Sequence, residues 1–286
     1  MIKTRNGQTV VTNEGQNRLL KKLYGSVSGR ILLKSLTAPA VSKAAGAFMD
    51  SPLSKPLIKR FIKSAGIDTS EYIMKGIRCY NDFFTRKVKP EKRPVDYEPS
   101  HLISPCDSKL TVYKIGRNSI FRIKGSRYRV SDLLQNQFLA ERFSGGYCLI
   151  FRLEVDDYHR YCYIDSGTKT DNTFIQGELH TVNPIALERY NIYKRNSREY
   201  TVMHTDNFGD VVQVEVGAMM VGRIVNHHGE SAVSRGEEKG MFEFGGSTIV
   251  MLFEKDSIVI DEDILRNSAN AYETVVKYGE KIGTAR

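Results

Sequence analysis

A serine follows two glycines and precedes an apolar run in the stretch FEFGGSTIVMLFEKD, residues 242–256. Gly245 and Gly246 lack the Cβ atom that restricts a backbone, so unusual φ and ψ angles are open to them. Such a turn could cradle an anion, expose an activated serine, or let the Ser247 hydroxyl attack the carbonyl of the residue before it. A plain turn or β-bulge that leads into a buried strand has the same composition.

Several common catalytic signatures are absent from the sequence. No G-x-x-x-x-G-K-[ST] stretch occurs, which excludes a P-loop. The nucleophile elbow G-x-S-x-G fails because Ile249 stands where its last glycine belongs. Neither H-E-x-x-H nor paired C-x-x-C occurs, so no metal site is predicted. Two explanations remain for the stretch: a structural turn, which composition alone favours, and cleavage of the bond between Gly246 and Ser247.

Self-cleavage at this bond needs a defined set of groups. The Ser247 hydroxyl attacks the Gly246 carbonyl, a nearby base takes the hydroxyl proton, and hydrogen-bond donors hold the oxyanion. The product is an ester, and elimination followed by hydrolysis converts Ser247 into a pyruvoyl group that caps the new chain. This ketone could form a Schiff base with a substrate amine and accept electrons as carbon dioxide leaves, as pyridoxal phosphate does.

Basic charge is concentrated near the N-terminus. The chain of 286 residues has a net charge of +9, and between Asn17 and Lys63 ten Lys or Arg residues stand against one acid, Asp50. A localised basic segment indicates an anionic partner such as lipid head groups or nucleic acid, or simply a solvated face. No C-x-x-C pair or dense framework joins the four cysteines, so free thiols in a reducing compartment are expected: Cys79, Cys106, Cys148 and Cys162.

Helices are predicted for this basic segment. Apolar residues recur every three or four positions in residues 17–36, and residues 51–66 repeat the pattern with Ser51 as N-cap, Pro52 in the first turn and Gly66 at the end. Basic amphipathic helices suit an anionic membrane interface, although their apolar stripes could equally pack on the main domain. The polar N-terminus lacks a signal-peptide core, and no apolar run approaches the roughly 18–20 residues that span a bilayer. We expect a protein on the cytoplasmic side of the cell membrane, attached peripherally.

The predicted secondary structure changes from helix to strand after a charged linker with several prolines at residues 79–96. Short runs rich in β-branched and aromatic residues follow, with one helix expected near residues 130–143 and a short helix plus a polar tail at residues 261–286. The predicted fold class is α+β. An antiparallel β-rich catalytic domain, residues 97–286, is preceded by basic amphipathic helices within residues 1–78.

Six stretches occur together, in a fixed order, between residue 78 and the C-terminus: YNDFFTRKVKPEKRPVD, SPCDSKL, DDYHRYCYIDSG, HTVNPIAL, FGDVVQVEVGAMMVGRIV and RGEEKGMFEFGGST. In this combination the chain resembles the phosphatidylserine decarboxylase proenzymes, in the branch that carries Gly-Gly-Ser-Thr rather than Leu-Gly-Ser-Thr. The resemblance implies self-cleavage between residues 246 and 247 and a pyruvoyl cofactor derived from Ser247. It also implies conversion of phosphatidylserine to phosphatidylethanolamine through a Schiff base.

The resemblance assigns roles to individual residues. Ser247 matches the serine that becomes the pyruvoyl group, and Gly246 supplies the new carboxyl end. Asp107, in SPCDSKL, matches the aspartate of the charge-relay triad that orients a charged histidine. From its own neighbours, Asp107 would be a turn residue after a serine and a proline.

The triad histidine is where this sequence departs from the family pattern. The family motif has two histidines separated by two residues; here the first is His159, and Cys162 stands at the second, which is usually assigned as the cleavage base. Either His159 serves both steps, or Cys162 takes part with a pKa lowered by neighbours, or another histidine such as His204 substitutes. We expect His159 to be the base.

Partners follow from the same resemblance. It implies phosphatidylserine in an anionic membrane as substrate, two cleavage chains (1–246 and 247–286) that stay together, and a homodimer; no nucleic acid is expected. Two alternatives stay open. One is a pyruvoyl decarboxylase of another amine, which would not need a basic amphipathic segment. The other is an uncleaved, non-enzymatic family member that binds membrane or nucleic acid.

Overall fold

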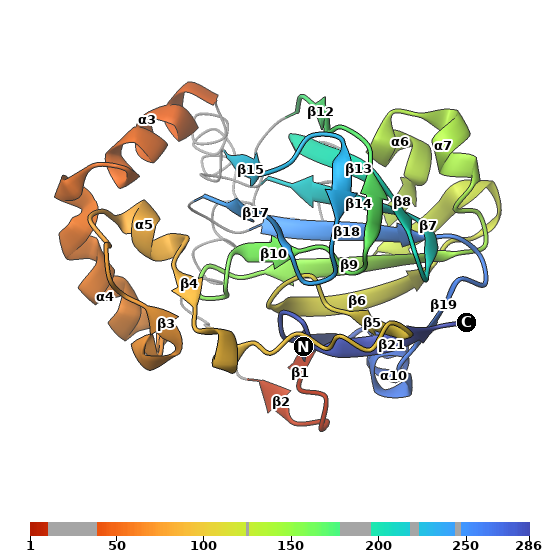
Figure 1. The fold of residues 1–286 in the computed structure, drawn as a ribbon, viewed down its shortest axis with the longest axis horizontal. Coiled ribbons are helices and arrows are strands. Elements are labelled where there is room, and N and C mark those ends of the chain that lie inside the picture. Colours follow the sequence, from red (N-terminus) through yellow and green to blue (C-terminus); the bar gives the residue numbers. More distant parts are fainter. Residues whose placement is uncertain (11–38, 124–125, 178–195, 218–222, 244–246) are drawn as a thin grey trace.

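A large mixed β-sheet dominates the computed structural model, which describes residues 1–10, 39–123, 126–177, 196–217, 223–243 and 247–286 (Figure 1). In spatial order its strands are β16 (Ser231–Val233), β11 (Gly167–Lys169), β13 (Arg198–Thr205), β14 (Gly209–Val216), β18 (Ser247–Phe253), β9 (Tyr147–Leu153), β6 (Ser108–Lys114), β20 (Glu273–Val276), β1 (Ile2–Lys3) and β2 (Thr9–Val10), with β12 (Thr173–Ile175) beside β13. The pair β1–β20 is parallel, and the other pairs of this sheet are antiparallel.

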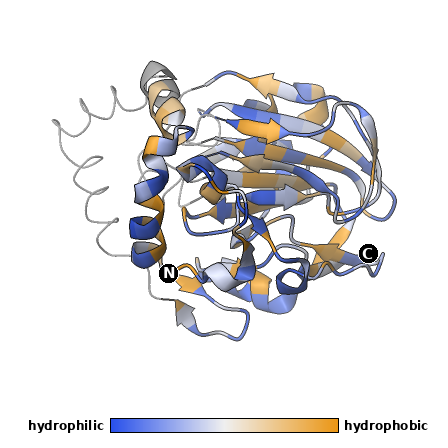
Figure 2. Ribbon diagram, turned by 60° about the vertical axis from the view of Figure 1, so that its left-hand side comes forward, coloured by the Kyte–Doolittle hydropathy of each residue, from blue (hydrophilic) through white to orange (hydrophobic). Residues whose placement is uncertain are grey.

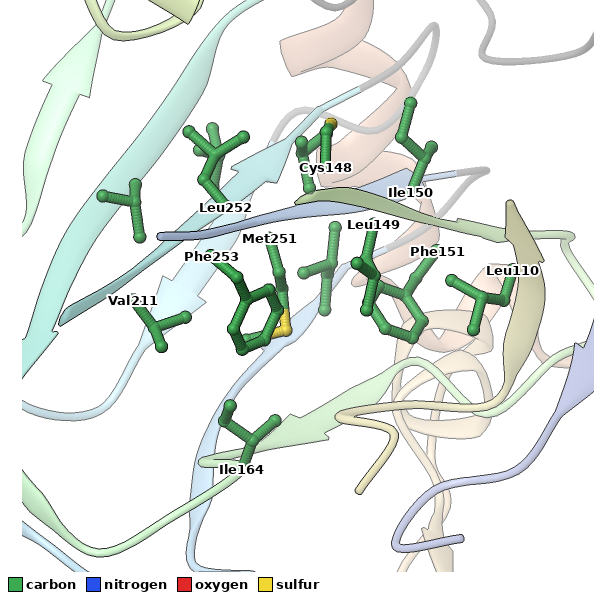
Figure 3. Close-up of a cluster of buried hydrophobic side chains, with 14 of the residues drawn as sticks. Leu110, Cys148, Leu149, Ile150, Phe151, Ile164, Val211, Met251, Leu252 and Phe253 are labelled. Carbon is green, nitrogen blue, oxygen red and sulfur yellow. The ribbon is translucent and has the colours of Figure 1, made fainter. Parts of the chain in front are cut away.

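The centre of this sheet is covered on both faces, which explains why β18 reads as an unbroken apolar run. Every residue of β18 is buried, as is typical of a strand with no solvated face. Figure 3 shows both layers of side chains. Met251 and Phe253 point with Phe151 toward Ile164, and Leu252 points away from it. One continuous hydrophobic cluster contains both layers.

Smaller sheets surround the large one. The first consists of β10 (Arg160–Cys162), β17 (Glu238–Phe242) and β15 (Ile224–Asn226), and the second of β19 (Ile258–Ile260), β21 (Lys281–Ala285) and β5 (His101–Ile103). Two further sheets have two strands each: β3 (Tyr72–Ile73) with β4 (Lys87–Val88), and β7 (Ile120–Ile123) with β8 (Ser126–Arg129). Figure 2 shows hydrophobic residues along the central strands and hydrophilic residues in the surrounding loops.

The helices gather in two places. At one end of the molecule, on the left of Figure 1, lie α3 (Pro39–Met49), α4 (Lys55–Ala65) and α5 (Tyr80–Phe84). At the other end, on the upper right, lie α6 (Val130–Leu134) and α7 (Gln137–Glu141), while α10 (Glu262–Ala269) is the exception and lies apart from both groups, below β21. Short 3-10 turns complete the set: η1 (Pro52–Ser54), η2 (Thr69–Glu71), η3 (Pro90–Lys92) and η4 (Arg117–Ser119). None of the helices in the described part of the chain is long and apolar enough to cross a bilayer.

The helix predicted at residues 51–66 is confirmed in α4. Its end is capped by Gly66, which adopts the left-handed conformation (φ 66°) that glycine tolerates best. Ser51 caps the short turn η1 just before it, and Pro52 opens that turn. The helix predicted for residues 17–36 lies outside the described residues.

The β-rich α+β prediction is confirmed, and four free cysteines are present, all buried. Three local expectations were wrong. The single helix expected near residues 130–143 is two, because Gln135 adopts a left-handed conformation (φ 51°) between α6 and α7. The expected polar tail instead forms β20 and β21 after α10. Finally, the region before residue 79, which was expected to be helical, begins instead with β1 and β2 at the edge of the large sheet.

Candidate active site

Ser247 is the first residue of β18 and is completely buried. Its neighbour across the sheet is Leu153, the last residue of β9. From Leu153 the chain turns over residues 154–159 and returns as β10, in the small sheet. This turn brings His159 back to Ser247. Gly245 and Gly246 lie outside the described residues.

The side chains of Ser247 and His159 meet in the interior. Ser247 Oγ lies 3.4 Å from His159 Nδ1, and neither residue is exposed to solvent. On the other side of the ring, Nε2 lies 3.0 Å from the backbone carbonyl oxygen of Glu154. Because a carbonyl oxygen can only accept a hydrogen bond, Nε2 carries the proton of the neutral ring. The lone pair of Nδ1 therefore faces the serine hydroxyl.

The charge state of His159 suits a base. Burial, together with the positive charges of Arg86 and Lys109, lowers the pKa of His159 to about 3. The imidazole is therefore neutral at physiological pH and free to accept a proton. The same low pKa makes the neutral imidazole a weak base and its protonated form a strong acid, so His159 holds a proton only transiently and returns it readily.

A buried ion pair holds the loop that presents His159. Lys109 Nζ on β6 lies 2.6 and 2.8 Å from the two carboxylate oxygens of Asp157. The same carboxylate accepts the backbone N–H of Glu154 at 2.7 Å, and the Asp157 N–H donates to the Glu154 carbonyl at 3.0 Å. Burial opposes the charged form of Lys109, but the carboxylates of Asp157 and Glu154 outweigh it and raise its pKa. Asp157 therefore fixes the carbonyl that sets the tautomer of His159.

Asp107 is buried but is paired elsewhere. Arg93 donates to both of its carboxylate oxygens at 2.7–3.1 Å, and the Tyr278 N–H donates at 2.9 Å. Lys277 Nζ lies 3.3 Å away. Burial alone would raise the pKa of Asp107, but the hydrogen bond from Arg93 and the charge of Lys277 lower it below its ordinary value. Among the described residues, no hydrogen bond joins Asp107 to His159 or Ser247, so the expected triad is not assembled by direct contact.

Cys162 is buried in β10, close to Tyr278, which also contacts Asp107. Its backbone N–H donates to the Pro105 carbonyl at 3.0 Å, and its thiol interacts with the Tyr278 hydroxyl. Burial raises the pKa of the Cys162 thiol to about 12. A thiol with that pKa stays protonated at neutral pH and does not act as a base.

His204 lies far from the serine. It pairs with Asp210 on β14 at 2.6 Å and is about half exposed, with 53% of its side-chain surface accessible. Thr248, next to Ser247, pairs with Val216, six residues further along β14. At about 3.3 Å per residue this separation is roughly 20 Å. The structure therefore brings His159 to Ser247 but not His204.

Sequence reasoning found the serine and the histidine but missed their supports. The Glu154 carbonyl carries no side-chain signal, and the pairs Lys109–Asp157 and Arg93–Asp107 join distant segments. The adjacent acids of the DDYHRY stretch, which include Asp157, were the one available hint.

A buried serine at the start of a core strand, facing the free nitrogen of a neutral histidine, defines a serine–histidine site equipped for acyl chemistry. The family model described as phosphatidylserine decarboxylase matches residues 80–284. The phosphatidylserine decarboxylase proenzyme 2 of Clostridium acetobutylicum is 49% identical over 269 residues, 94% of this chain and 92% of that protein. The proenzyme of Ruminiclostridium cellulolyticum is 43% identical over 273 residues (93% and 91%), and that of Clostridium perfringens strain SM101 is 41% identical over 292 residues (99% of each). The chain belongs to the phosphatidylserine decarboxylase family.

Proposed function

We propose that this chain is a phosphatidylserine decarboxylase proenzyme that cuts itself between Gly246 and Ser247. The observation that carries the proposal is the 3.4 Å approach of Ser247 Oγ to the unprotonated nitrogen of His159 in a chain of this family. Asp107, which the family resemblance places in the triad, is proposed instead to join the segment of Arg93 to the C-terminal segment of Tyr278, because its carboxylate accepts hydrogen bonds from both.

The cleavage chemistry balances with these residues and one water molecule. His159 Nδ1 takes the hydroxyl proton, Oγ attacks the Gly246 carbonyl carbon, and the peptide C–N bond breaks as the proton passes to the departing nitrogen of residue 247. In the resulting ester a base removes the Cα proton of residue 247, the Cβ–Oγ bond breaks, and the carboxylate of Gly246 leaves. The dehydroalanine that remains tautomerises to an imine, and water replaces its nitrogen, which leaves as ammonia. The products are a chain of residues 1–246 and a chain of residues 247–286 that begins with a pyruvoyl group.

The residues around Ser247 fit such a group, since the site is buried and holds a neutral base. The pyruvoyl carbonyl supplies an electron sink for the carbon that loses carbon dioxide. The serine head group of phosphatidylserine arrives as an ammonium ion, which must lose a proton before it reacts. His159 Nδ1 is proposed to relay that proton to the carbon that has lost the carboxylate, giving phosphatidylethanolamine; a relay holds the proton only transiently, as the low pKa of the imidazole requires.

Membrane attachment is proposed to use charge on α4. Its apolar stripe packs inward, with Ile58 buried and Phe61 against the rings of α5, while its basic residues stay exposed: Lys55, Lys59, Arg60 and Lys63. Phe48 and Leu53, which precede α4 in the sequence, are also exposed. A basic face with adjacent apolar side chains suits the anionic, cytoplasmic surface of a cell membrane. A Lys59→Glu/Lys63→Glu chain should co-sediment less with phosphatidylserine vesicles, and unchanged sedimentation would refute this surface.

Intact mass spectrometry of the purified protein tests the proposal as a whole. We expect two chains, the shorter blocked at its start by pyruvate, and release of carbon dioxide from phosphatidylserine in mixed micelles but not from free serine. A single uncut chain of 286 residues would refute self-cleavage, and turnover of free serine would refute the lipid substrate. Native mass spectrometry tests the proposed homodimer in the same sample.

A further inference from the structure

Helix α5 and the segment that follows it lie directly against the loop that carries His159. Three contacts join them. Arg86 donates to the Asp156 carbonyl at 3.1 Å, and Arg160 donates to the Thr85 carbonyl at 2.8 Å. The third contact is between rings: Phe84, the last residue of α5, stacks on the imidazole of His159 with centroids 4.0 Å apart and an angle of 26° between the planes.

The position of α5 is fixed by contacts at its start and by the neighbouring residues of η1 and α4. Cys79 and Asp82 form a reciprocal capping box at its start, and the Tyr80 N–H donates to the Ser54 hydroxyl at 2.8 Å. Phe61 of α4 packs against the rings of Tyr80 and Phe83, at 5.5 and 6.1 Å. These side chains form a hydrophobic cluster separate from the main core. Helix α4 therefore supports α5, and α5 in turn contacts the His159 ring through Phe84.

One hydrogen bond does not fix the orientation of an imidazole. The bond from Nε2 to the Glu154 carbonyl holds one atom of the His159 ring but leaves the ring free to turn about that bond. Contact with the fully buried Phe84 restricts the plane of the ring. Together the two contacts direct Nδ1 at the hydroxyl of Ser247.

We propose that Phe84 is a positioning residue for His159, so that the helical layer α4–α5 is part of the self-cleavage site as well as an attachment surface. This role rests on the proposed function, because it concerns the base of the cleavage step. Its consequence is specific: loss of the Phe84 ring slows cleavage, whereas loss of another ring in the same cluster does not.

The experiment compares Phe84→Leu with the matched variant Phe61→Leu in full-length chains. Each change removes one aromatic ring from the same cluster, but only Phe84 stacks on His159. Appearance of the two chains is followed by intact mass. We expect Phe84→Leu to cleave about ten- to a hundredfold more slowly, the usual effect of a misplaced catalytic group, and Phe61→Leu to cleave at close to the parent rate.

A spectroscopic measurement separates positioning from general destabilisation. In the uncleaved Ser247→Ala chain, the Phe84 ring should shift the NMR signal of the His159 Cε1 proton upfield. Phe84→Leu should abolish that shift and Phe61→Leu should keep it, while thermal unfolding reports the stability lost in each. Phe84→Met replaces the leucine variant if the latter does not fold.

Two results would overturn the proposal: Phe84→Leu cleaving at the parent rate, or Phe61→Leu being slowed as strongly as Phe84→Leu. A parent chain that cuts itself in the same experiment leaves the proposed function standing in either case. A parent chain that stays whole would overturn both the proposed function and this role.

Discussion

Two buried aspartates, Asp107 and Asp157, occupy contrasting regions of the molecule. Both are almost inaccessible, with 1% and 9% of their surface exposed, and both pair with a cation. Asp157 belongs to the loop that presents His159, and its carboxylate holds that loop to Lys109. Asp107 joins the linker residue Arg93 to the C-terminal Tyr278. Asp157 therefore supports His159 because it organises the same loop, whereas Asp107 organises other segments and does not contact the histidine.

The electrostatics of the two regions differ as well. Burial raises the pKa of Asp157 despite the charge of Lys109. For Asp107, burial is outweighed by Arg93 and Lys277, and its pKa is lowered. The negative charge of Asp107, which the family pattern marks as catalytic, is thus better stabilised by neighbouring cations than that of Asp157. Such stabilisation is expected of a carboxylate that joins two segments of the structure. The four predictions below test this contrast, in order of decreasing effect.

The largest effect is expected for His159→Gln, which removes the base but keeps a side chain of similar length. Self-cleavage should slow by about a thousandfold, within the usual range for loss of a general base. Appearance of the two chains by intact mass is the measurement. Cys162→Ser and His204→Gln serve as controls and should cleave normally. A fast His159→Gln chain would place the base at another residue.

The second prediction sets Asp157→Asn against Asp107→Asn. Each change replaces one carboxylate oxygen by an amide nitrogen, so the two variants are matched in size. Asp157→Asn loosens the loop that orients His159 and should slow cleavage by up to about a hundredfold. Asp107→Asn should slow it much less. The reverse order would show that Asp107, not Asp157, is the acid that supports the base.

The third prediction concerns the joint at Asp107. Asp107 and Tyr278 fall on different chains after cleavage, so Asp107→Asn should weaken the hold between the chains. We expect a loss of about 1 kcal/mol, because the hydrogen bond from the Tyr278 N–H loses its charged acceptor and the half-exposed Lys277 loses its ionic partner. The urea concentration at which the short chain separates measures this loss. An unchanged midpoint would contradict the assignment.

The smallest effect is expected from pH. His159 stays neutral in the folded chain down to about pH 3, so the cleavage rate should vary by no more than about twofold between pH 5 and 8. An unfolded histidine takes up a proton near pH 6.5. Acid therefore favours the unfolded chain, and the stability that neutral His159 contributes is lost as pH falls from about 6.5 toward 3. A rate that falls tenfold per unit below pH 6.5 would contradict a buried neutral base.

The comparison also shows what the sequence could predict. Helix α4 was predictable because its periodicity and its Gly66 cap are local signals. Strands β20 and β1 were missed because they are short and pair with each other across nearly the whole chain. Ser247 and His159 were found from motifs, whereas the Glu154 carbonyl and the Arg93–Asp107 pair depend on long-range folding, which local composition does not encode.

The order of strands carries a consequence for maturation. The segment after residue 246 supplies β18 between β14 and β9, β20 between β6 and β1, and β21 beside β5. Two of these strands have neighbours on both sides from the segment before the cut. Neither product of a cut at residue 246 then holds the whole of the large sheet or of the β19–β21–β5 sheet. We therefore expect the chain to fold first as one continuous polypeptide and to be cut afterwards, so that the presence of two chains would report that folding had already been completed.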